Sequence, residues 1–421
     1  MTTRRATSGT FWPARNPGHT TVARSNAWWS RGRAAAKLVF SMPIELSAYL
    51  RRTRTTYIYK AKIRRIQQSP LVMERRSHET HSGEFLRRSR EFLRQHFGRY
   101  RDIRWHTTYA AANGIFSAEY IPEDVFYNSI EPSFNSMIYA DAYNDKNTPA
   151  LIGLDKFGPP SLAHIVDGKP FDSTFKAIRW GQLAAIIKEA DSEIVIKSSI
   201  GGGGADVHFA AATDSWTLLQ AILDQLRQEQ GRANVIIERV IRQSPDLAAI
   251  SPTSLNTMRI MTARIFQDVH LISSVLRMGR QGSRVDNQSA GGISCGIEFD
   301  GSLKSRAYDK SFESYDYHPD SRVSFRGRRL TYYNEAVTMC LALHEKLPYF
   351  DLVSWDVAVR EDGKILIVEY NIRSQEINFH QVNNGPLFNP ITETAMRYYK
   401  ERLATRRAVA RFWAQKATYP R

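Results

Sequence analysis

Two short β-type segments near the C-terminus, at 352–359 and 364–369, constrain the fold more than any other part of the chain. Both are rich in Val, Ile and Leu, and only the turn at 360–363 separates them, which predicts an antiparallel hairpin. Three polar residues interrupt this apolar pattern: Asp356, Glu369 and Asn371. Residues two apart on a strand share a face, so Glu369 and Asn371 point together, and hairpin pairing brings Asp356 beside them.

Polar side chains in an apolar hairpin are costly to bury unless they have partners or a ligand. Two carboxylates and an amide oxygen suit Mg²⁺, which binds through few protein oxygens together with nucleotide phosphates. Asp356, Glu369 and Asn371 are therefore the predicted metal ligands, for Mg²⁺ or, as a substitute, Mn²⁺. A polar cluster with no ligand is the alternative.

A second segment joins an apolar strand to four consecutive glycines. The strand at 193–198 carries Lys197, and Gly201, Gly202, Gly203 and Gly204 follow before the next β-type run. Glycines let backbone N–H groups approach an anion closely, and the lysine supplies a point charge. No Gly-Lys-Ser/Thr opens a helix here, so this is not a P-loop, and a strand rather than a helix follows the glycines. A mobile hairpin tip is the alternative interpretation.

A third segment, at 235–241, is a strand that ends near Glu238 and Val240. A carboxylate and backbone groups at such a point can contact the edge of a base, with apolar residues covering its faces. By itself this pattern is weak, because Glu at a strand end is common.

The remaining pattern from residue 105 onward alternates short β-type runs with amphipathic helices at 215–229 and 332–347. Further strands are expected at 257–266 and 270–278. This arrangement predicts an α+β enzyme core with a largely antiparallel sheet.

The positive charge of the chain is confined to its first quarter. Residues 1–104 hold 23 Lys/Arg and 6 Asp/Glu, so the remainder, with 35 and 36, is electrically balanced. We expect a disordered basic tail at 1–40 and a basic helical extension at 41–104, with a helix at 83–97. The arginines are either a solvated face or a surface for anionic lipid or polysaccharide intermediates. No nucleic-acid-binding motif accompanies them, so specific nucleic-acid binding is not expected.

No stretch approaches the ~20 apolar residues of a membrane span. Cys295 and Cys340 lie far apart in unlike contexts, which argues against a disulfide framework and suits a reducing compartment. The expected location is cytoplasmic, with peripheral contact at the inner membrane face left open. The oligomeric state is also open, and a dimer is compatible with the sequence.

The order of these segments resembles the ATP-grasp superfamily: strand with Lys, glycine-rich loop, strand with Glu, then Asp-x12-Glu-x-Asn. Lys146, followed by Gly158-Pro159-Pro160, resembles the first phosphate-binding lysine segment, and 285–292 resembles an Asn-x-x-x-Gly-Gly segment. The runs at 254–262, 285–292 and 369–373 are most similar to the sugar-transfer-associated ATP-grasp family of bacterial polysaccharide clusters. The resemblance covers 105–395 and implies a lead part at 105–190, a nucleotide- and metal-binding core at 191–395, and a C-terminal helix at 396–421.

The resemblance implies roles for individual residues. Lys146 and Lys197 would bind ATP phosphates beneath a flap formed by 201–204. Glu238 and the backbone of Val240 would read adenine, and Asp246 would reach the ribose. Candidate catalytic residues are Arg259, Arg277, Asn287 and Arg373.

The implied reaction joins a carboxylate to an amine through an acyl phosphate, with ATP and Mg²⁺. The substrates would be an amino acid or similar acid and an amino sugar or carrier-linked glycan, in polysaccharide or secondary-metabolite biosynthesis. Two features depart from the family pattern. Ser354 stands where many relatives have an arginine, and Arg373-Ser374 stands where they have Pro-Gly, so the acceptor side is expected to be remodelled. His380 is the best candidate for a base.

Two other functions remain open at this point. The first is phosphotransfer to a hydroxyl or histidine, and the second is a non-catalytic nucleotide-binding scaffold. Amide formation that depends on an added amine distinguishes ligation from both.

Overall fold

The computed structural model describes residues 44–75, 83–190, 192–201, 206–211, 213–231 and 233–417. The predicted tail at 1–40 and the glycines Gly202, Gly203 and Gly204 lie outside these residues. The chain divides into two units, 1–54 and 55–421, and the description below concerns the second.

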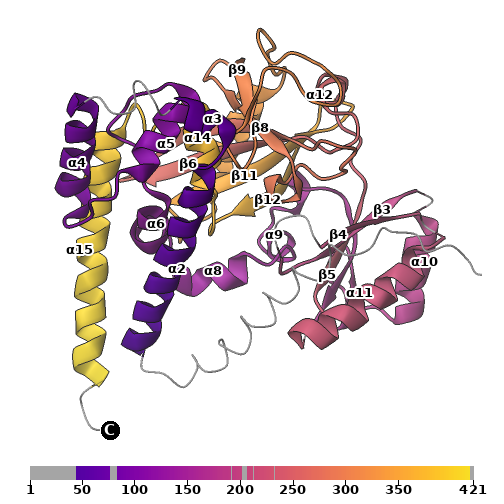
Figure 1. Cartoon of the computed structure of the whole chain (residues 1–421). Coiled ribbons are helices and arrows are strands. Elements are labelled where there is room, and N and C mark those ends of the chain that lie inside the picture. Colours follow the sequence, from indigo (N-terminus) through magenta and orange to yellow (C-terminus); the bar gives the residue numbers. More distant parts are fainter. Residues whose placement is uncertain are drawn as a thin grey trace, which may run out of the picture. The chain divides into compact units, whose positions relative to one another are not determined.

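Helices dominate the first part of the described chain (Figure 1). They are α2 (Ile44–Ile66), which begins in the first unit, α3 (Pro70–Arg75), α4 (Gly83–Phe97), α5 (Arg104–Asn113), α6 (Glu123–Val125), the π-helix η1 (Phe126–Ile130), α7 (Glu131–Phe134), α8 (Met137–Tyr143), α9 (Thr148–Leu151) and the 3-10 helix η2 (Asp155–Phe157). The helix predicted at 83–97 is confirmed. Its buried side includes Ser89 and His96 as well as Phe85 and Leu93.

The smaller of two sheets has the strand order β2-β1-β5-β3-β4. Its strands are β1 (Ser161–Val166), β2 (Lys169–Asp172), β3 (Ile194–Ser198), β4 (Val207–Ala210) and β5 (Val235–Arg239), and each pairing is antiparallel. The helices α10 (Trp180–Glu189) and α11 (Ser215–Gln230) pack on it. Leu219, Ile222, Leu223 and Leu226 recur at helical spacing and form the buried stripe of α11.

The larger sheet has the order β10-β9-β8-β7-β6-β11-β12 and is also antiparallel. Its strands are β6 (Thr257–Ile265), β7 (Asp268–Met278), β8 (Ile293–Ile297), β9 (Leu303–Tyr308), β10 (Ser314–Tyr315), β11 (Leu352–Val359) and β12 (Ile365–Asn371). The accompanying helices are α12 (Pro245–Ile250), η3 (Gln288–Ala290), α13 (Tyr333–His344), α14 (Ile377–Asn384) and α15 (Thr392–Ala417). The predicted α+β fold and the predicted hairpin are confirmed.

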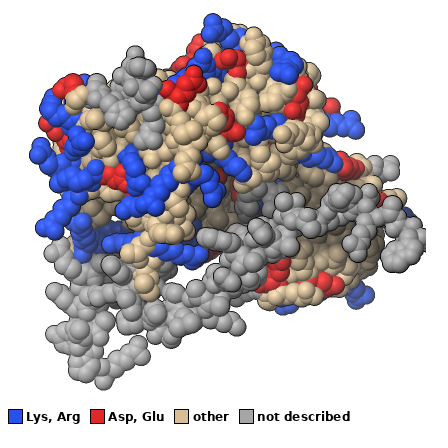
Figure 2. Space-filling model, in the orientation of Figure 1, with Lys and Arg blue, Asp and Glu red and all other residues tan. Residues whose placement is uncertain are grey.

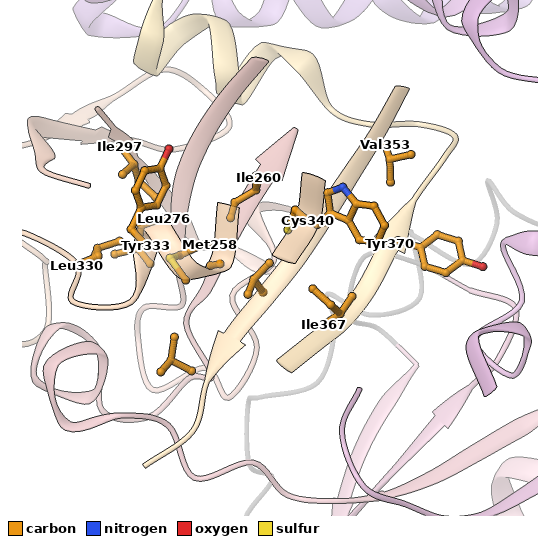
Figure 3. Packing of buried hydrophobic residues seen from close by; sticks show 14 of the residues in the cluster. Met258, Ile260, Leu276, Ile297, Leu330, Tyr333, Cys340, Val353, Ile367 and Tyr370 are labelled. Atoms are coloured by element: carbon orange, nitrogen blue, oxygen red, sulfur yellow. The ribbon is translucent and has the colours of Figure 1, made fainter. Parts of the chain in front are cut away.

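The two faces of the larger sheet differ in chemistry. On one face, apolar side chains such as Met258, Ile260 and Leu276 pack with Tyr333 and Cys340 of α13 (Figure 3). Successive residues of a strand point to opposite faces, so the residues between them, including Arg259 and Arg277, lie on the other face. Charged residues occupy only part of that other face, because Met261, Ala263 and Ile265 of β6 pack there with Ile377 in a second apolar cluster. The part that carries Arg259 and Arg277 is available for chemistry.

Candidate functional site

A cavity of about 400 Å³ is lined by residues of both sheets. From the smaller sheet and the segments around it come Lys146, Lys197, Gly201 and Glu238, and from the larger sheet come Arg277, Asp356 and Glu369. Both predicted phosphate-binding lysines and two of the three predicted metal ligands, up to 223 residues apart in sequence, thus share one cavity. The third predicted ligand, Asn371, is not among the residues that line it.

Two lysines connect the parts of this cavity. Lys197, on β3, has its Nζ 2.5 Å from Oε2 of Glu238 on the neighbouring strand β5. The Nζ of Lys146 donates to the carbonyl oxygen of Gly201 at 2.7 Å and lies 3.4 Å from Oε1 of Glu369. Both ammonium groups are mostly buried, so the cavity holds fixed positive charge beside carboxylates and the start of the glycine segment.

Gly201 lies directly against the carboxylate of Asp206. A Cβ at this position would overlap Oδ2 of Asp206, which follows the glycine segment and also lines the cavity. The other three glycines of the predicted flap lie outside the described residues, so the flap remains a prediction.

The three predicted metal ligands lie together at one end of the hairpin. Asp356 is opposite Glu369, and Ser354 is opposite Asn371, with a register shift just after Asp356. The Nδ2 of Asn371 is 3.4 Å from Oδ2 of Asp356.

A chain of alternating charges surrounds Asp356. Arg259 binds it in bidentate fashion, with Nε 2.7 Å from Oδ1 and Nη2 2.7 Å from Oδ2. Nη1 of Arg277 donates to Oδ2 at 3.0 Å, while its Nη2 lies 3.2 Å from Asp286. Nη1 of Arg259 in turn donates to Glu376 at 2.8 Å. The order is therefore Asp286, Arg277, Asp356, Arg259, Glu376.

This arrangement decides the charge of Asp356. Burial by itself would raise the pKa of the carboxyl, but the two guanidinium groups outweigh it and hold the pKa at about 2. Asp356 is thus ionised at neutral pH. For Asp286 the balance is the reverse, because burial raises its pKa above the usual value even though Arg277 lowers it.

The donor set fits Mg²⁺. Two carboxylates and one amide are hard oxygen donors, and no group of three or more His, Cys, Asp and Glu residues forms a fuller cage in the described part of the chain. The side chain of Glu369 is 30% exposed and that of Asp356 is 7% exposed and shared by two arginines. Glu369 is therefore the more accessible anionic donor of the set.

The residues predicted to contact adenine line the cavity, whereas the residue predicted to contact the ribose does not. Glu238 and Val240 both line the cavity, with the carboxylate of Glu238 already bonded to Lys197. Asp246 lies in the first turn of α12, where its Oδ1 accepts a hydrogen bond from Ser244, and it is not among the residues that line the cavity.

Two of the four predicted catalytic residues line the cavity, and the other two do not. Asn287 lines the cavity and precedes η3, and Arg277 lines it too. Arg259 reaches it only through Asp356. Arg373 is on the surface, where its Nη1 is bonded to Asp141.

A polar layer between α14 and the larger sheet was not predicted from the sequence. His380 Nδ1 is 2.9 Å from Ser273 Oγ, Asn384 Nδ2 donates to the same oxygen, and Asn383 Nδ2 donates to Ser294. Gly296 lies directly beneath this layer, because a Cβ there would overlap Oδ1 of Asn384 in its present position. The run of amides at 378–384 was the signal that could have identified this layer.

His380, the candidate base, is fully buried in this layer. Burial and, to a smaller extent, the nearby Arg259 and Arg277 together lower its pKa to about 3. The imidazole is therefore neutral near pH 7 and a poor proton acceptor. The structure argues against its role as a base.

Comparison with known proteins identifies the family but not the substrate. No curated protein matches the chain. Among solved structures, it is similar to biotin carboxylase from Campylobacter jejuni (TM-score 0.39, 12% identity, 61% of this chain and 46% of that one). It is also similar to the biotin carboxylase domain of Hydrogenobacter thermophilus 2-oxoglutarate carboxylase (TM-score 0.38, 12% identity, 61% of this chain and 45% of that one). A third similar structure is Vibrio cholerae D-alanyl-alanine synthetase A (TM-score 0.37, 9% identity, 63% of this chain and 66% of that one). The chain spans less than half the length of the two carboxylase chains that it matches.

A family model gives the decisive match. The model for the sugar-transfer associated ATP-grasp proteins matches residues 135–395, which include both sheets and every residue assigned to the cavity. The match covers well over half of the chain. The chain therefore belongs to the sugar-transfer-associated ATP-grasp family.

Proposed function

We propose that the protein is a Mg-ATP-dependent ligase that activates a carboxylate and joins it to an amine. The observation that carries this proposal is the shared cavity: Lys146, Lys197, Asp356 and Glu369 all line it, and Nζ of Lys146 lies 3.4 Å from Oε1 of Glu369. A volume of about 400 Å³ is within the range of small-molecule sites.

The charges of the lining suit a metal–triphosphate ligand. Six Lys and Arg side chains face five Asp and Glu side chains, so the lining is nearly balanced and cannot by itself offset a triphosphate. Bound Mg²⁺, held by Glu369, Asn371 and Asp356, would supply the missing positive charge at the phosphate oxygens. Lys146 and Lys197 would hold the phosphates in line with the incoming carboxylate.

The reaction would proceed in two displacements. A carboxylate oxygen attacks the γ-phosphorus, forming a P–O bond as the bond to ADP breaks. The amine nitrogen then attacks the acyl carbon, phosphate leaves, and the nitrogen loses a proton. Arg277 borders the cavity and has its Nε buried without a partner among the described residues, which suits it to developing negative charge.

The acceptor is proposed to be a hydroxyl-rich amine, such as an amino sugar or a carrier-linked glycan. The family description points to the same class of ligand.

Hydroxylamine trapping tests the proposal. Protein, Mg-ATP, hydroxylamine and a panel of carboxylic acids are expected to give a hydroxamate, ADP and phosphate, and Mn²⁺ is expected to replace Mg²⁺. Amino sugars in place of hydroxylamine should give amides. Glu369→Gln, which removes the accessible anionic donor, should stop both reactions. ADP release with a phosphorylated acceptor and no free phosphate would instead identify a phosphotransferase.

A further inference from the structure

The helix α2 is held to the body of the protein by one side only. Tyr59 stacks on Tyr127 with ring centroids 4.9 Å apart, and Nζ of Lys62 is 2.7 Å from the buried carboxylate of Glu123. Ile63, one turn beyond Tyr59, is buried, with 1% of its surface exposed. These contacts fix which side of the helix faces outward.

The outward side combines apolar and basic side chains. Tyr57 and Ile58 are 72% and 46% exposed, and Lys60, Arg64 and Arg65 are exposed beside them. We call these five residues the α2 outer face. Residues three and four apart on a helix are neighbours, so Arg64 and Arg65 lie one to two turns from Tyr57 and Ile58 on the same side. Met73 of α3, 55% exposed, adds a further apolar side chain nearby in sequence.

The two arginines of the α2 outer face have no acidic partner among the residues that the structure describes. Residues 55–73 contain no Asp or Glu. Within the described residues, no ion pair involves Arg64 or Arg65, whereas Arg87 of α4 is paired with both Glu84 and Glu91. Figure 2 shows Lys and Arg side chains gathered over the side of the molecule that carries α2 and α4.

We propose that the α2 outer face docks on a bilayer surface that carries anionic lipid headgroups. Such surfaces attract clustered Lys and Arg, and exposed aromatic and aliphatic side chains enter the boundary between headgroups and acyl chains. A nucleic acid would use the arginines but would leave Ile58 and Met73 in water. In the described part of the chain, no helix is long and apolar enough to cross a membrane, so contact through these helices would be peripheral. This inference does not depend on the proposed ligase reaction.

Vesicle sedimentation with the full chain tests the docking surface. Vesicles of phosphatidylcholine with about one third phosphatidylserine should bind the protein, and pure phosphatidylcholine vesicles should not. Each arginine near an anionic surface contributes roughly a five-fold factor, so Arg64→Ala with Arg65→Ala should weaken binding about thirty-fold. Tyr57→Ser with Ile58→Ser should weaken binding without any change in charge.

A matched control removes two exposed arginines elsewhere. Arg326→Ala with Arg329→Ala, between β10 and α13, should leave vesicle binding unchanged, and all three variants should keep the thermal midpoint of the wild type. Equal loss in the control, binding to neutral vesicles, or absence of binding would overturn the proposal. So would duplex DNA that displaces the vesicles and whose binding depends on the arginines but not on Tyr57 and Ile58.

Discussion

Replacing Asp356 by Asn tests the charge chain at the centre of the site. The amide keeps the shape of the side chain but leaves Arg259 and Arg277, whose side chains are 5% and 2% exposed, without their shared anion. Removing one partner of a buried ion pair typically costs 3–5 kcal/mol. Asp286 still pairs with Arg277, and the half-exposed Glu376 still pairs with Arg259, so we expect the low end, about 3 kcal/mol.

Urea unfolding followed by tryptophan fluorescence, without nucleotide, measures this loss. Asp224→Asn, which breaks an exposed pair with Arg227 on α11, serves as the control and should change the free energy of unfolding by less than about 0.5 kcal/mol. A loss below about 1 kcal/mol for Asp356→Asn would refute the reasoning, because it would mean that the two arginines do not depend on this carboxylate.

The pH dependence of the same variant gives an independent value. The folded pKa of Asp356, about 2, lies below the unfolded value, so its stabilisation is present above the unfolded pKa and is lost as pH falls through about 2. The unfolded value is about 3.9, and the difference corresponds to roughly 2–3 kcal/mol. Wild type and variant should therefore converge in stability between about pH 4 and pH 2.

Three further predictions concern the stability of the protein without ligands. Burial raises the pKa of Glu131 to about 8, so ionising this carboxyl destabilises the folded protein. This destabilisation is absent below the unfolded pKa and is complete above pH 8. Glu131→Gln should therefore raise the thermal midpoint at pH 8 but not at pH 4. A Cβ at Gly292 would lie 2.5 Å from the carbonyl oxygen of Asp286, so Gly292→Ala should lower the free energy of unfolding by about 1–3 kcal/mol in urea. Gly181→Ala, with open space around it in α10, should instead stabilise by about 0.5–1 kcal/mol in the same assay.

Much of the fold was predictable from local patterns. The strands at 193–198, 257–266 and 352–359, and the helices at 215–229 and 332–347, appear in the structure within a few residues of their predicted ends. Their apolar periodicity determines which side is buried, and this signal is local. The hairpin itself was also predictable from its short turn, but that register alone would place Asp356 opposite Val368. A register shift just after Asp356, which the sequence does not reveal, places it opposite Glu369.

Contacts between distant segments were not predictable in the same way. The sequence marks Arg259 and Arg277 as charged residues on strands, but it does not show that both bind Asp356. Nor does it show that Arg373 turns to Asp141. Such contacts depend on strand order and helix placement, which a single sequence does not specify.

Thermal denaturation with and without Mg-ATP tests most directly whether the cavity is a nucleotide site. Binding at ~100 times the dissociation constant should stabilise the wild type by about 2.7 kcal/mol. Lys197→Ala should abolish this gain, while Lys188→Ala, on the last turn of α10, should keep it. If ATP with Mg²⁺ or Mn²⁺ leaves the wild type unchanged, or stabilises Lys197→Ala equally, the assignment of this cavity to ATP is wrong.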